Sequence, residues 1–72
     1  MSYKHFLIAE ASDQMTLLKD LLEELEDSHK AFIVADHALR VYLLEDLKNV
    51  TQKIRKALTD HYNRCGQIKQ KL

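Results

Sequence analysis

The sequence predicts an all-α protein, and more specifically an antiparallel helical hairpin that self-associates into a four-helix bundle. Its 72 residues include no proline and a single glycine, Gly66, and residues that favour helices dominate the chain. Apolar residues also recur at alternating steps of three and four, the spacing of a helix packed along one side. A chain of this length forms one domain, so residues 1–72 are predicted to be a single hairpin domain.

The first helix is predicted within residues 2–34. Its clearest part carries an apolar seam with heptad spacing, and Leu17 and Leu21 widen that seam to a broader core-facing stripe. The helix is predicted to begin either at Ser2, with a break near Ser12, or at Ser12 itself, because each serine is a suitable N-cap residue. The seam consists of Ala11, Met15, Leu18, Leu22 and Leu25.

The turn is predicted within residues 28–37. Ser28 or Asp36 could each cap the second helix, and a single uninterrupted helix is the remaining alternative. A turn before Ser28 would leave about 14 residues of the second helix overhanging, or about 21 Å. We favour the later turn, because it matches the two seams from end to end. The predicted pairs are Phe32 with Leu39, Leu25 with Leu47, Leu22 with Val50, Leu18 with Ile54, and Met15 with Ala57.

The second helix is predicted to run to about residue 70. Its seam has extra four-residue steps at Leu43–Leu47 and His61–Cys65, which locally unwind a coiled coil toward straight packing. Near its start, Asp36 and Arg40 have the spacing of an ion pair within a helix. The seam consists of Leu39, Leu43, Leu47, Val50, Ile54, Ala57, His61, Cys65, Ile68 and Leu72.

The middle of the chain carries more apolar surface than one neighbouring helix can cover. Four apolar residues in a row at 41–44 would face all sides of a helix, and a chain this short buries only about 60% of its unfolded surface. These features predict a homodimer. The expected interface residues are Met15, Leu18, Leu22, Leu25, Phe32, Leu39, Val41, Tyr42, Leu43, Leu44, Leu47, Val50 and Ile54.

The net charge of zero hides a strong charge asymmetry. Residues 1–36 carry three Lys or Arg against eight Asp or Glu, a net charge of −5, and residues 37–72 carry eight against three, a net charge of +5. Opposite charges along a contact favour antiparallel packing of two hairpins. A basic stripe on the second helix is also a candidate nucleic-acid site. Its residues are Lys53, Lys56, Arg64 and Lys71.

Little in the sequence indicates catalysis. Glu26 and His29 form a single Glu-x-x-His, whereas di-iron bundles need two such motifs and further glutamates. Cys65 has His61 one turn away, but no residue in the sequence pattern is expected to orient the imidazole. We therefore expect no metal, no cofactor and no enzyme activity.

A single cysteine fits a reducing compartment, and no apolar run approaches the ~20 residues of a membrane span. The sequence accordingly predicts a cytoplasmic protein that does not enter a membrane. We expect a non-enzymatic interaction module that homodimerises and acts as a regulator or adaptor. The alternatives are a nucleic-acid-binding regulator and an obligate heteromeric chaperone or antitoxin-like partner.

Overall fold

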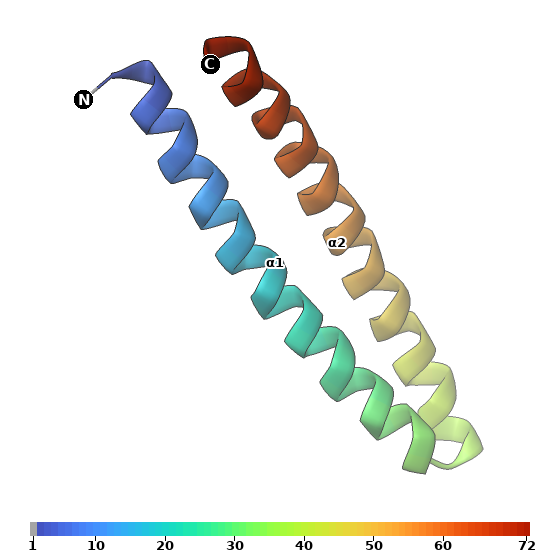
Figure 1. Cartoon of the computed structure of the whole chain (residues 1–72). Coiled ribbons are helices and arrows are strands. Elements are labelled where there is room, and N and C mark those ends of the chain that lie inside the picture. The colour runs from blue at the N-terminus through green and yellow to red at the C-terminus, as the bar shows by residue number, and fades with distance from the viewer. Residues whose placement is uncertain (1) are drawn as a thin grey trace.

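The computed structural model describes residues 2–72 and shows two long α-helices joined by a short turn. Helix α1 spans Tyr3–Val34 and helix α2 spans His37–Lys71. The helices run antiparallel, with both chain ends at one end of the molecule and the turn at the other (Figure 1). The prediction of an all-α antiparallel hairpin is confirmed.

Helix α1 begins at the earlier of its two expected positions. The Ser2 hydroxyl accepts a hydrogen bond from the His5 amide at 3.2 Å, which satisfies one of the free N–H groups of the first turn. Ser12 is an interior residue instead, and its hydroxyl donates to the Ile8 carbonyl at 3.1 Å. The helix therefore passes through Ser12 without a break.

The turn consists of Ala35 and Asp36, in extended backbone conformations with negative φ angles. The Asp36 carboxylate accepts a hydrogen bond from the Leu39 amide at 2.9 Å and caps α2. Arg40 does not pair with Asp36 as the spacing predicts. Its guanidinium donates to the carbonyls of Phe32 at 3.3 Å and Ile33 at 3.2 Å. The Phe32 carbonyl also accepts from the Ala35 amide at 3.3 Å. Because the last carbonyls of a helix lack the usual partners of its interior, Arg40 adds hydrogen bonds there and closes α1 from the start of α2.

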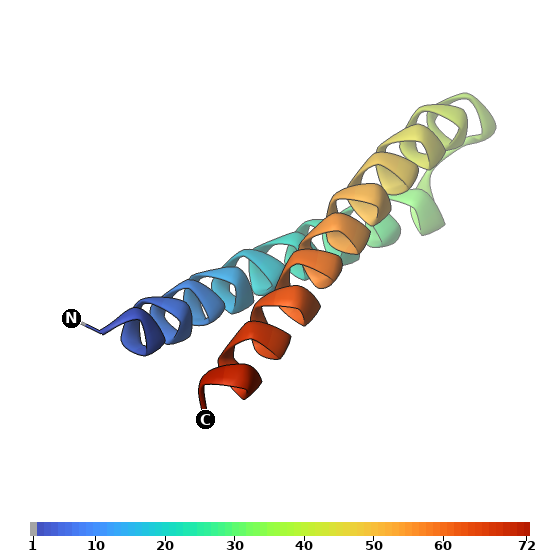
Figure 2. The same ribbon diagram turned by 90° about the horizontal axis from the view of Figure 1, so that it is seen from above.

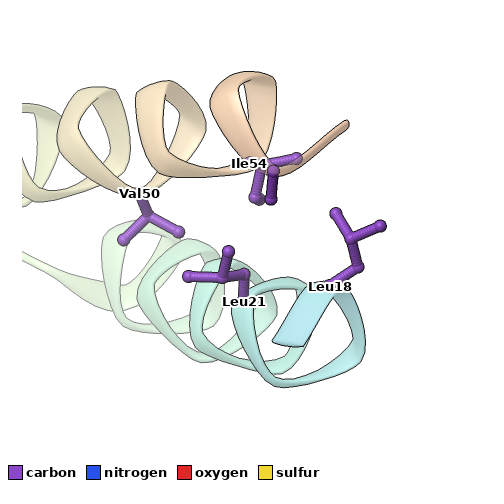
Figure 3. Packing of buried hydrophobic residues seen from close by; sticks show 5 residues of the cluster. Leu18, Leu21, Val50 and Ile54 are labelled. Carbon is purple, nitrogen blue, oxygen red and sulfur yellow. The ribbon is translucent and has the colours of Figure 1, made fainter. Parts of the chain in front are cut away.

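The two helices cross near their middle, and the buried cluster lies there (Figure 2). In Figure 3, Leu18 and Leu21 of α1 point toward Val50 and Ile54 of α2. Ala57 completes the cluster, and the half-buried Leu25 packs against it. The predicted pairing of Leu22 with Val50 is wrong, because Leu21 is 8% exposed while Leu22 is 52% exposed.

The contact line on each helix follows a regular heptad that is partly polar. On α1 it uses Gln14 and Leu21 in place of the predicted Met15 and Leu22, and on α2 it uses Arg64 in place of Cys65. The predicted stutter at His61–Cys65 therefore does not occur. At the open end of the hairpin Gln14 contacts His61. His61 lies about one helical turn further along α2 than Ala57, which was the predicted partner of the neighbouring Met15.

Candidate interaction surface

The structure divides the predicted interface residues between the inside and the outside of the hairpin. Buried or half-buried in the contact between α1 and α2 are Leu18, Leu25, Phe32, Leu43, Leu47, Val50 and Ile54. The remaining six are exposed, namely Met15, Leu22, Leu39, Val41, Tyr42 and Leu44. The stretch from Ala31 to Leu47, where the sequence predicts the turn and the most enclosed part of the second helix, contains no buried residue.

One side of the contact line is polar. Between the helices near the open end lies a shallow pocket lined by residues from both. Gln14 of α1 and Arg64 of α2 stand at its edge, where the contact line meets this side. The remaining lining residues are Glu10, Asp60, Asn63 and Gln67.

The other side of the contact line is apolar. Each step along an α-helix rotates the side chain by about 100°, so Met15 and Cys65 lie across the contact line from Gln14 and Arg64. Because the helices are antiparallel, the same step carries both side chains to the same side of the hairpin. Heptad steps extend this row to Ile8 and Leu22 on α1 and to Leu58 on α2.

We call this surface the apolar side face. It consists of Ile8, Met15, Leu22 and Ile33 of α1 and Leu44, Leu58, Tyr62 and Cys65 of α2. Its aliphatic and methionine side chains are 42% to 57% exposed and Tyr62 is 80% exposed. Exposed apolar residues are ordinary when scattered, whereas several gathered on one side indicate a binding surface.

More than half of this face is absent from the predicted interface. Five of its eight residues were not among the predicted interface residues, namely Ile8, Ile33, Leu58, Tyr62 and Cys65. The signal was present in the seven-residue spacing of Ile8, Met15 and Leu22, but the prediction placed Met15 and Leu22 inside the hairpin. When Gln14 and Leu21 are assigned to the contact with α2, Met15 and Leu22 fall in a separate row that faces outward.

The chain exposes more surface than a compact protein of its mass. A folded monomer of this size exposes about 4,600 Å², whereas this chain of 8.4 kDa exposes 5775 Å². Its radius of gyration is 16.4 Å, against about 11 Å for a compact domain of this length. The excess of roughly 1,200 Å² is larger than the ~800 Å² that each partner buries in a standard protein interface.

Polar contacts tie the helices together at the open end. Arg64 donates to the Glu10 carboxylate at 2.9 Å and to the Gln67 side chain at 3.0 Å, and it is only 23% exposed. Its Nε atom is buried without a hydrogen-bond partner, which carries a desolvation cost. Arg64 therefore belongs to the contact between the helices and not to a solvent-facing basic stripe.

The predicted nucleic-acid site is dispersed by the fold. Lys53 and Lys56 are exposed and lie together beside Asn49 and Gln52. Lys71 instead lies over the Tyr3 ring, 5.4 Å from its centroid, and Arg64 pairs with Glu10. Two neighbouring lysines make a much smaller phosphate-binding surface than the four predicted cations.

The structure orients His61, which the sequence analysis did not anticipate. Its Nδ1 lies 3.1 Å from the Gln14 Oε1 atom, and its Nε2 lies 3.7 Å from the exposed Cys65 thiol. Because Oε1 can only accept, the hydrogen bond to Gln14 requires a proton on Nδ1, and Nε2 is the ring nitrogen that faces the thiol. The arrangement lies beside a shallow hollow formed with Leu58, Thr59 and Tyr62, on the apolar side face.

Glu26 pairs with Lys30 and not with His29. The Lys30 ammonium lies 3.0 Å from the carboxylate, and the hydrogen bond to Glu26, followed by its charge, raises the pKa of Lys30 above its ordinary value. Within residues 2–72 no group of three or more His, Cys, Asp or Glu side chains is arranged to hold a metal ion.

Comparisons with protein-family models, with curated proteins and with solved structures gave no significant match. Over the part of the chain that the structure describes, neither helix combines the length and apolar character needed to cross a membrane.

Proposed function

We propose that this chain is a non-enzymatic helical interaction module of the cytoplasm. It homodimerises through the apolar side face into a four-helix bundle, and the dimer acts as a regulator or adaptor for other proteins. The observation that carries the proposal is the row of exposed apolar residues along one side of the hairpin, in which Thr51 and His29 are polar interruptions.

The energetics support this assignment. Only six apolar residues are buried among those described, and a core this small stabilises a chain weakly without further burial. A second layer of helices would cover Met15, Leu22 and Leu58, which are each about half exposed. Burial of apolar surface contributes about 25 cal/mol per Å², so covering the face would stabilise the folded hairpin substantially.

A pair of matched variants tests the role of the face. Leu22 and Leu17 are equally exposed, at 52% and 51%, but only Leu22 lies on the apolar side face. Leu22→Asp should abolish the dimer in sedimentation equilibrium and lower helicity by circular dichroism. Leu17→Asp should leave both close to the wild-type values, because its side chain lies toward the polar side.

Two results would count against the proposal. A wild-type chain that sediments as a stable folded monomer at high micromolar concentration would assign the face to a different protein, which is the heteromeric alternative. A Leu22→Asp variant that keeps the dimer would place the contact on another surface.

A further inference from the structure

We infer that the second copy packs on the apolar side face in antiparallel orientation, with the turn of each hairpin beside the chain ends of the other, and that charge selects this orientation. The inference rests on the proposed function, because it requires the two copies to meet at that face. It follows from the charge distribution along the folded hairpin, which differs from the distribution along the sequence.

The hairpin is an electric dipole along its long axis. Glu10 of α1 contacts Arg64 of α2. Because the helices are antiparallel, ten residues forward on α1 match ten residues back on α2, so residue 20 lies level with residue 54. The turn half, residues 20–54, carries four Lys or Arg against eight Asp or Glu, a net charge of −4. The open half, residues 2–19 and 55–72, carries seven against three, a net charge of +4.

The charges gather on opposite helices as well as at opposite ends. The acidic residues of the turn half lie mainly on α1 between Asp20 and Asp27, and the basic residues of the open half lie mainly on α2 between Arg55 and Lys71. Antiparallel packing brings the acidic segment of each copy to the level of the basic segment of the other. Parallel packing brings like segments to the same level, which disfavours that arrangement.

The apolar residues fit both orientations, so they do not decide between them. In the antiparallel pair, Ile8 lies level with Ile33 of the second copy, and Met15 lies near its Leu22. In the parallel pair, Met15 lies level with Leu58 and Ile33 with Leu44. The apolar side face therefore supplies the attraction and the dipole supplies the orientation.

Distances between spin labels distinguish the two arrangements. The variant Cys65→Ser/Gln70→Cys carries one label at an exposed position of α2 that is not on the apolar side face. Gln70 lies 16 residues beyond Ile54, the midpoint of α2. In an antiparallel dimer the two labels should therefore lie about 50 Å apart. In a parallel dimer both labels lie at the same end and should be less than about 30 Å apart.

A mixture with a second variant provides the complementary distance. Chains of Cys65→Ser/Ala38→Cys carry the label near the turn, at another exposed position. Mixed with the Gln70→Cys chains, they should give a short distance between copies only in the antiparallel dimer. A short distance in a sample that contains only the Gln70→Cys chains would overturn the inferred orientation. The proposed function would remain intact. A labelled chain without any distance between copies, and monomeric in sedimentation, would overturn both.

The role of charge has its own measurement. Raising the ionic strength from about 0.05 M to about 0.5 M shortens the screening length severalfold, so the dimer dissociation constant should rise severalfold. The quadruple variant Glu23→Lys/Glu24→Lys/Cys65→Ser/Gln70→Cys, labelled at its one cysteine, reverses two turn-half charges and should add a short-distance population. A salt-independent dissociation constant, or an unchanged long distance in that variant, would overturn charge as the selecting force.

Discussion

At the scale of single residues, Arg64 shows how a polar side chain can occupy a position that packing would give to an apolar one. It stands on the contact line between His61 and Ile68, with its Nε unpaired and its terminal nitrogens held by Glu10 and Gln67. An ion pair that is partly removed from water often stabilises less than a well-packed apolar side chain. The arrangement contributes register instead, because Gln67 lies on the same helix as Arg64 and only the Glu10 carboxylate reaches it from α1.

Replacing Arg64 with leucine should stabilise the hairpin. Arg64→Leu removes the buried unpaired Nε and adds an apolar side chain to the contact line, while Glu10, 39% exposed, stays hydrated. We expect a gain of about 1 kcal/mol, or a rise in Tm of about 4–8 °C, measured by thermal unfolding at one fixed protein concentration. Asn63→Leu, at the neighbouring exposed position, is the control and should change Tm little. A lowered Tm for Arg64→Leu would show that the ion pair stabilises the fold.

At the scale of elements, the turn is set by contacts between the helix ends and not by a glycine. Asp36 caps α2, and Arg40 reaches back to the last carbonyls of α1 while lying over the Phe32 ring, 5.4 Å from its centroid. Both residues are close in sequence to the helix ends with which they form hydrogen bonds. Local contacts of this kind hold the turn although the surrounding apolar residues are exposed.

A proline at the first position of α2 tests this account of the turn. The first helical N–H has no partner inside a helix, and Asp36 has the extended backbone that proline requires of its predecessor. His37→Pro should therefore stabilise the protein by about 0.4–1 kcal/mol through the unfolded chain, measured by urea denaturation. Ala38→Pro is the matched control and should destabilise, because it disfavours the helical conformation of His37. Equal effects of the two variants would contradict the observed start of α2.

The fold was predictable from the sequence, whereas the face of α1 that meets α2 was not. Heptad spacing and the Asp36 cap predict two helices and favour the later turn. The same spacing fits Met15 and Leu22 as well as Gln14 and Leu21 on either side of the shared positions Ala11, Leu18 and Leu25. Apolar character favours Met15 over Gln14, and the structure pairs Gln14 with His61 instead. A polar pair between two helices cannot be predicted from the spacing of apolar residues along each helix.

At the scale of the whole molecule, the hairpin is a rod with one apolar side. Its Cα atoms extend over 53 × 15 × 13 Å, so most residues lie near the surface and a partner can reach the full length of both helices. If the folded state is stabilised by dimer formation, its stability depends on protein concentration through mass action.

Thermal unfolding across a range of concentrations measures that dependence directly. The Tm of the wild-type chain should rise by several degrees over a hundredfold increase in concentration, since binding stabilises by about 2.7 kcal/mol when the partner is at 100 times its Kd. Leu22→Asp should show a low Tm that does not change with concentration. A concentration-independent Tm for the wild type would indicate that the folded hairpin is stable as a monomer.

The position of the buried cluster gives the rod a gradient of rigidity. Leu18, Leu21, Val50, Ile54 and Ala57 hold the middle, and Leu7 is fully buried toward the chain ends, but no residue from Leu22 through Asn49 is buried. Segments with few buried contacts open at low free energy. The last turns of α1 and the first turns of α2 therefore separate more easily than the middle, held mainly by Asp36 and Arg40. A second hairpin packed along the first would restrict that opening. Dimer formation should therefore reduce motion most strongly in the last turns of α1 and the first turns of α2.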